Sequence, residues 1–191
     1  MKTLIKLTAA AMLVGTLASQ AFAADVFVIE PNHSFPRFSY SHFGMSTQIS
    51  RFNSTKGKIV LDAAAKTGSV EVEIDMKSVD TGSTLFNGHI QGEDFLDTAK
   101  YPTATFKSTA VRFEGDKPVA VDGTLTIKGV SKPVTLKVTS FNRMNHPMNK
   151  KDWVGADAVT VIKRSDFKAD KYVPNVGDEV TITIAVEALH E

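Results

Sequence analysis

The chain has 191 residues, of which 42% are hydrophobic, and its 22 basic and 21 acidic residues leave a formal net charge of +1. This length suits one domain, the apolar content excludes a wholly disordered chain, and the near-neutral charge argues against nucleic acid as a partner. The sequence contains no cysteine, which excludes a disulfide framework, thiolate metal ligands and thiol catalysis.

The first 23 residues have the pattern of a cleaved secretory signal. Lys2 and Lys6 precede an apolar run at residues 7–17, and Ala21 and Ala23 have the small-residue spacing of a cleavage site. The run is shorter than the ~20 residues that a transmembrane helix needs. We therefore expect residues 1–23 to be removed and residues 24–191 to form a single exported domain without an integral membrane span.

Alternation of apolar and polar residues with a period of two predicts strands along most of the mature chain. The candidates are residues 26–30, 35–43, 47–61, 70–76, 103–113, 124–128, 134–138, 154–163 and 180–187. The long candidate at 47–61 should bend at Asn53 or Gly57, and turns are expected at 115–118, 129–133 and 145–151. Because each strand has one apolar and one polar face, the sheet should be antiparallel.

Residues 77–100 do not alternate and are expected to form one or two short helices before Pro102 starts the next strand. About eight strands fit either a closed barrel or a two-layer sandwich. The length of several strands favours the barrel, which at this size can hold a small ligand inside. We therefore expect an all-β antiparallel barrel, a meander of about eight strands with a short helical insertion.

Catalytic and metal-binding patterns are not found in the sequence. The five histidines lack metal-ligand spacing, and neither a nucleophile elbow nor a phosphate-binding loop occurs. We predict no metal site and no catalytic residue. Aromatic residues are instead frequent on the expected inner faces, where they either fill a packed core or line a tunnel for a long apolar molecule.

Four segments, in order, carry a family resemblance: HSFPRFSYSHFG at 33–44, DFLDTAKYPTATFKS at 94–108, GTLTIKGVSKPVTL at 123–136 and RSDF at 164–167. Together they resemble the YceI-like family of exported lipid-binding proteins over essentially the whole mature length. The resemblance implies a lipocalin-like barrel with an elongated internal apolar cavity. It also implies a periplasmic protein, in some members a homodimer, that holds a polyprenyl chain, an isoprenoid quinone or another long amphiphile with its tail inside. No cofactor other than such a bound lipid is implied.

The same resemblance, combined with the inward-facing pattern, predicts the ligand-binding residues. His42 is a candidate polar contact at one end of the barrel, and Phe86 and Ile90 on the helical insertion are candidates for a gate. The predicted cavity wall consists of Phe38, Tyr40, Phe95, Leu96, Phe106, Leu125, Ile127, Trp153 and Phe167. Relatives often carry a basic residue and a serine where this chain has Gln91 and Gly92, so we expect weak selectivity for the head group.

Three functions follow from these patterns. The first is a non-enzymatic carrier or store for a long isoprenoid amphiphile. The second is a redox accessory protein that presents a bound quinone, although no residue pattern supplies redox chemistry of its own. The third is an envelope protein-interaction module whose barrel is packed solid. Tail burial alone can support the first, since each buried methylene contributes ~0.8 kcal/mol.

Overall fold

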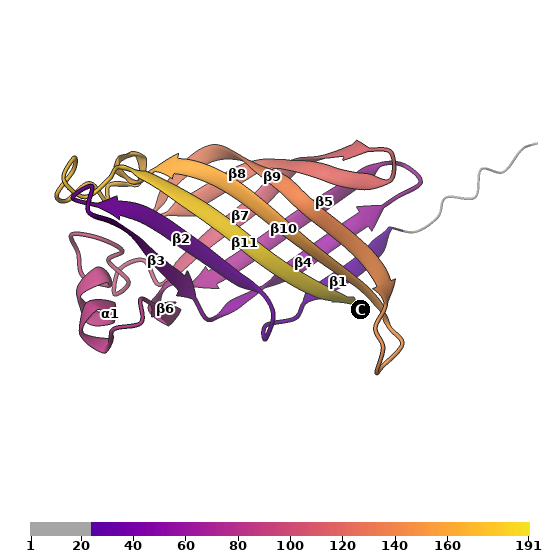
Figure 1. The fold of residues 1–191 in the computed structure, drawn as a ribbon. Coiled ribbons are helices and arrows are strands. Elements are labelled where there is room, and N and C mark those ends of the chain that lie inside the picture. Colours follow the sequence, from indigo (N-terminus) through magenta and orange to yellow (C-terminus); the bar gives the residue numbers. More distant parts are fainter. Residues whose placement is uncertain (1–23) are drawn as a thin grey trace, which may run out of the picture.

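A computed structural model describes residues 24–191, in which eleven strands form one antiparallel sheet (Figure 1). The expected signal segment and its cleavage site lie outside the described residues. The strands are β1 (Asp25–Ile29), β2 (Phe35–His42), β3 (Ser46–Phe52), β4 (Thr55–Asp62), β5 (Thr67–Asp75), β6 (Val79–Asp80), β7 (Thr103–Glu114), β8 (Lys117–Ile127), β9 (Val130–Asn145), β10 (Asp152–Lys163) and β11 (Glu179–His190). The helices are the 3-10 turns η1 (Met76–Ser78) and η2 (Arg164–Phe167) and the α-helix α1 (Thr84–Ile90).

The sheet closes on itself into a barrel because β11 has two different partners along its length. It pairs with β2 through Thr181–Ala185 and with β1 through Ala188–His190. In the same way β3 pairs with β2 while β4 pairs with β1. Strands β1 and β2 together occupy one place in the ring, and so do β3 and β4. With the short β6 left out, the ring has eight places. The expected eight-strand antiparallel barrel is therefore confirmed.

Local hydrogen bonds explain the two interrupted positions. Between β1 and β2, the Ser34 hydroxyl donates to the Glu187 carbonyl at 3.1 Å and accepts from the Glu187 N–H at 3.0 Å, in place of a strand neighbour. Between β3 and β4, the N–H of Asn53 donates to the Ser78 carbonyl at 3.0 Å. The expected bend at Asn53 thus occurs, and η1 satisfies the backbone that the bend frees.

The helical insertion lies between β6 and β7 and contributes α1. The Ser83 side chain caps the helix by accepting from the N–H of Phe86, as serine commonly does at this position. The expected short helices are therefore found, followed by turns up to β7. In Figure 1, α1 lies at the same end of the barrel as the β2–β3 turn and the connection between η2 and β11.

The predicted turn at 129–133 is wrong in extent. Only Lys128 and Gly129 turn the chain, and β9 begins at Val130 and runs through Pro133. A proline within a strand is tolerated where no neighbour needs its missing N–H. The pairing of β9 with β10 ends at Lys137, so Pro133 lies on a part of β9 that β10 does not reach.

Candidate functional site

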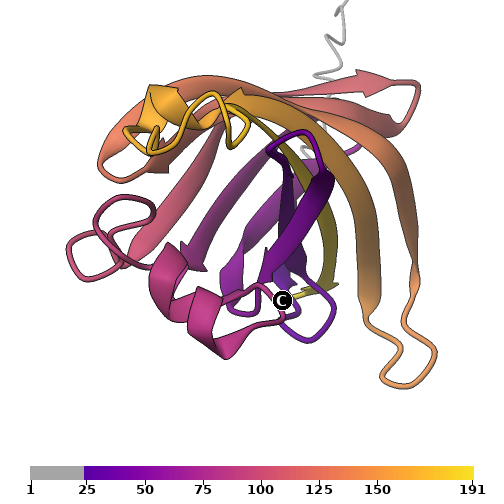
Figure 2. The same ribbon diagram turned by 60° about the vertical axis from the view of Figure 1, so that its left-hand side comes forward.

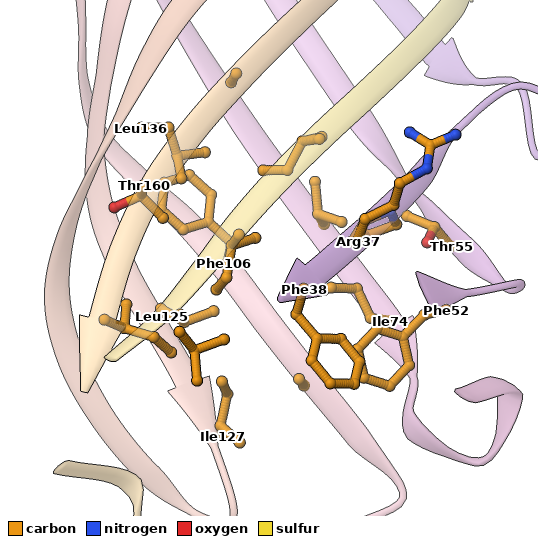
Figure 3. Close-up of a pocket in the computed structure, with 18 of the residues that line it drawn as sticks. Arg37, Phe38, Phe52, Thr55, Ile74, Phe106, Leu125, Ile127, Leu136 and Thr160 are labelled. Carbon is orange, nitrogen blue, oxygen red and sulfur yellow. The ribbon is translucent and has the colours of Figure 1, made fainter. Parts of the chain in front are cut away.

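A cavity of about 460 Å³ runs through the interior of the barrel, within the usual size range of small-molecule sites. Its lining extends from Phe43 and Tyr172 at the α1 end to Leu61 and Val154 at the opposite end. Figure 3 shows two facing groups of side chains, with Phe38, Phe52 and Ile74 in one and Phe106, Leu125 and Leu136 in the other. The lining is thus almost entirely apolar.

Most of the residues predicted from the sequence line this cavity. They are Phe38, Tyr40, His42, Phe86, Ile90, Phe95, Leu96, Phe106, Leu125, Ile127 and Phe167. They come from β2, α1, the turn after α1, β7, β8 and η2, so the fold brings together segments from both halves of the chain. Their position in the wall agrees with the prediction, whereas their contact with a ligand stays a prediction.

The prediction that Trp153 lies in the cavity wall is wrong. Trp153 is absent from the cavity lining, and its ring instead contacts His146 with centroids 5.0 Å apart. Its neighbour Val154 is 2% exposed and lines the cavity. Because side chains alternate along a strand, an inward Val154 turns Trp153 outward, and the choice between these two faces depends on the register of β10.

Several lining residues were missed, although the signal for most was present. β11 contributes Val180, Ile182 and Ile184 to the lining, and β10 contributes Ala158 and Ile162. All belong to the period-two pattern that predicted these strands. The preference for aromatic residues left them out of the predicted site. Tyr172 in the connection between η2 and β11 had no such signal, because an irregular segment carries no periodicity.

The cavity meets solvent at the α1 end. Phe43 and Tyr172 line the cavity and are 57% and 53% exposed. We call this end the mouth, formed by the β2–β3 turn, α1 with residues 91–102, and the mouth loop, residues 168–178. Figure 2 turns this end of the barrel toward the viewer, with α1 in front.

A chain of aromatic contacts crosses the mouth. His89 of α1 lies with its ring centroid 5.7 Å from Phe86 and 5.0 Å from Phe95. Phe95 continues to Tyr172 of the mouth loop at 6.2 Å. These distances are in the range of favourable aromatic pairs. The helical insertion and the mouth loop therefore touch across the entrance, and the gate at Phe86 and Ile90 stays a prediction.

Arg164 anchors the mouth loop. Its guanidinium donates to the carbonyls of Gly177 and Val176 at 2.8 Å each, and also to the carbonyl of Ala169. Burial lowers the pKa of Arg164, and nearby Asp178 opposes that effect. These bonds satisfy carbonyls that no strand partner reaches, so an irregular segment keeps a fixed position beside the cavity.

Lys128 ties the mouth loop to the insertion. It is 9% exposed, and its ammonium group donates to the Glu93 carbonyl at 3.0 Å and to the Lys168 carbonyl at 2.7 Å. The two carbonyls belong to segments on either side of the mouth. Gln91 also serves the local structure, since its side chain donates to the Asn87 carbonyl and accepts from the Thr98 hydroxyl.

Few polar side chains face the cavity. Tyr40 lies near the mouth, and burial raises the pKa of its hydroxyl while the charge of Arg164 opposes this. Thr55 lines the cavity farther in and is 6% exposed. Within residues 24–191 its hydroxyl has no hydrogen-bond partner. The cavity thus offers mainly apolar contact and a small number of hydrogen-bonding groups.

Glu30, His33 and Glu187 form a polar cluster at the connection between β1 and β2, with side-chain atoms within 4.8 Å of one another. The Nδ1 of His33 lies 2.7 Å from Glu30 Oε2, and the Asn32 N–H donates to Glu30 Oε1 at 2.9 Å. Partial burial raises the pKa of Glu30, but hydrogen bonds from Asn32 and His33 outweigh it and hold that pKa below its ordinary value. These contacts stabilise the turn between β1 and β2.

The fold and the cavity together define a lipocalin-like β-barrel, a class that encloses small apolar ligands. In the described residues 24–191, no helix is long and apolar enough to span a bilayer. The family model described as the YceI-like domain matches residues 27–188. This chain belongs to the YceI-like family.

The chain is similar to named proteins and to solved structures. The protein named YceI from Escherichia coli O6:H1 is 36% identical over 195 residues, covering 100% of this chain and 98% of that protein. The crystal structure of Burkholderia cenocepacia BcnA superposes with a TM-score of 0.70 at 30% identity, covering 81% of this chain and 96% of BcnA. A polyisoprenoid binding domain from Saccharophagus degradans gives a TM-score of 0.65 at 19% identity, covering 86% and 98% of the two chains.

Proposed function

We propose that this protein is a periplasmic, non-enzymatic binding protein that holds one long isoprenoid amphiphile for carriage or storage. The observation that carries the proposal is the apolar cavity of about 460 Å³ that runs the length of the barrel and opens at the mouth. The name of the polyisoprenoid binding domain of similar fold supports an isoprenoid as the ligand. The signal pattern at residues 1–23 supports export.

The energetics favour a tail-binding mode. Ten buried methylene groups contribute about 8 kcal/mol at ~0.8 kcal/mol each. Association costs roughly 4–15 kcal/mol in lost translational and rotational freedom. Burial of about twice as many methylene groups offsets even the upper estimate of this cost, so a tail can be bound without a charged anchor. The mouth offers Tyr40 and His42 to the head group. We therefore expect affinity to follow tail length more than head-group chemistry.

The alternative of a solid, packed barrel fits the interior less well. A packed core leaves few voids larger than a water molecule, whereas this interior has room for a ligand. A role as a quinone-presenting accessory remains compatible with the cavity, and a turnover assay with quinone-loaded protein separates it from simple carriage.

The first test is native mass spectrometry of the protein purified from the periplasm, followed by solvent extraction. We expect one bound lipid molecule per protein, present as a series of chain lengths that differ by the mass of an isoprene unit. We also expect the mature protein to begin at Ala24. A protein that stays empty after incubation with polyprenols and quinones of several lengths contradicts the proposal.

A matched pair of variants then places the ligand. Leu125→Arg puts a charge into the apolar wall, where burial of an unpaired charge is strongly unfavourable. Val161→Arg makes the same addition on β10 at a side chain that is 57% exposed and absent from the lining. We expect loss of binding for the first variant and normal binding for the second. If Leu125→Arg does not fold, Thr160→Trp fills the cavity from β10 without adding charge.

A further inference from the structure

The barrel wall separates at the end opposite the mouth. The pairing of β8 with β9 runs from Ile127 and Val130 to Ala120 and Lys137 and stops there. Beyond it, β8 stays with β7 and β9 stays with β10. Figures 1 and 2 both show the β7–β8 hairpin and the β9–β10 hairpin leaving the barrel in different directions.

The sequence around this separation explains it. Val119 is an extra residue in β8 opposite β7, and Thr139 is an extra residue in β9 opposite β10. Such bulges bend a strand and increase its twist, and here they lie one residue beyond the last pair in β8 and two residues beyond it in β9. Pro118 also lacks the N–H with which β8 could continue a ladder. The two strands therefore diverge for a reason encoded locally.

A second cavity of about 360 Å³ occupies the separation. It is lined by Phe113 and Pro118 of the β7–β8 hairpin and by Asn142 of β9, among others. Leu61, Pro118 and Phe141 line both this cavity and the main one. The two cavities are thus neighbours that share three lining residues, none of which is charged.

The part of the second cavity that is shared with the main cavity suits a hydrocarbon chain, whereas Asp116, Lys117, Asn142 and Arg143 make much of the rest of its lining polar. The shared side chains and Phe113 are apolar. Arg143 at its rim is already engaged, because its guanidinium donates to Asp152 at 2.9 Å and to Asp25 at 2.6 Å. Both partners are carboxylates, so Arg143 offers little free charge for recruiting an anion. An apolar chain arriving from the main cavity meets no polar group that must lose its hydration at the boundary.

We propose that the second cavity receives the distal end of an isoprenoid chain that is longer than the main cavity, with the chain passing between Leu61, Pro118 and Phe141. This inference rests on the proposed function and deepens it. The protein then accepts isoprenoids of graded length instead of selecting one length, because an excess of tail leaves the barrel beside β8 without returning to the mouth.

A thiol placed in the second cavity tests this directly, since the natural chain has no cysteine. In Asn142→Cys, we expect bound decaprenol to slow modification of the thiol by a maleimide at least tenfold. Bound geraniol, which has two isoprene units, should leave the rate unchanged. The control is Lys137→Cys, an exposed position of the same strand that lines neither cavity. There neither alcohol should change the rate. Native mass spectrometry establishes that each alcohol is bound.

A length series gives a second readout. Each further buried methylene should improve affinity about fourfold, from ~0.8 kcal/mol per group and 1.4 kcal/mol per tenfold. In the natural protein we expect affinity to keep rising to the longest prenols. In Asn142→Trp, which fills the second cavity, it should reach a plateau at a shorter chain.

The outcomes separate the two proposals. Bound decaprenol that leaves the thiol of Asn142→Cys unprotected overturns this inference and leaves the proposed function standing. Protection by geraniol also overturns it, because a short chain should end inside the main cavity. Failure of both alcohols to bind the natural protein refutes the proposed function itself.

Discussion

Replacing Gly123 by alanine tests how closely β8 packs against the cavity wall. A Cβ at this position would lie 2.5 Å from Cζ of Phe106 and 2.6 Å from the carbonyl oxygen of Lys107, whereas ordinary contacts begin near 3.4 Å. The Phe106 ring is 6% exposed and lines the cavity. Relief of the overlap therefore requires that the ring move, that β7 and β8 separate, or both.

Overpacking of this kind costs about 1–3 kcal/mol. For a domain of this size, each kcal/mol lowers the Tm by roughly 2–4 °C, so we expect Gly123→Ala to lower it by roughly 2–12 °C. If the ring moves inward, the cavity also shrinks, and the affinity for a long prenol should fall together with the Tm. Thermal unfolding and ligand titration measure the two effects on the same sample.

A second substitution shows which atoms cause the cost. Phe106→Leu removes the ring carbons but leaves the Lys107 carbonyl in place. Contacting residues commonly show coupling of about 0.5–3 kcal/mol, so Gly123→Ala should cost less in the Phe106→Leu background than in the natural chain. Gly123→Ala with an unchanged Tm would refute the packing geometry, and an equal cost in both backgrounds would refute the role of the ring.

Three further predictions concern the mouth and the outer face of the barrel. Burial raises the pKa of Asp178, but hydrogen bonds from the Ser165 N–H and hydroxyl and the charge of Arg164 outweigh it and hold that pKa below its ordinary value of 3.8. The ionised carboxylate should therefore stabilise the fold fully above pH 3.8, and this contribution should be lost as the pH falls through the lower pKa of the folded state. Acid titration of Asp178→Asn should not show this loss. Lys128→Met leaves two carbonyls without their donor and should cost about 1–3 kcal/mol, with faster hydrogen exchange in the two segments that the ammonium group joins. Trp153→Phe should leave the affinity for a prenol within twofold of the natural value, because the side chain lies outside the lining; a larger loss in a titration would place Trp153 at the ligand.

The sequence predicted the strands well because their information is local. In β11 the alternation of Val180, Ile182 and Ile184 with polar residues marks both the strand and its buried face, and all three line the cavity. The bend at Asn53 and the helical insertion were also readable, since each breaks the period of two. The length of the strands favoured a barrel over a sandwich, and the resemblance in four segments supported the barrel and implied the class of ligand.

The errors arose where register or irregular backbone decides. The choice of inward face in β10 was wrong for Trp153, because an apolar valine and an aromatic residue stand side by side and the sequence does not say which points inward. Pro133 was assigned to a turn because proline usually ends a strand, yet β10 does not reach that part of β9. Tyr172 of the mouth loop was missed altogether. That loop is held by Arg164 and by the C-terminal end of β2, and the hydrogen bonds to β2 join residues far apart in the sequence.

By itself, the sequence determined the strand pattern, the apolar inner face and the family of this protein, because side-chain alternation and short motifs are properties of neighbouring residues. Only the tertiary structure decided that the interior remains hollow, where it opens, and that β8 and β9 part beside a second cavity. Volumes and openings depend on how strands paired across the whole chain are spaced and twisted, and no local stretch of residues contains that information.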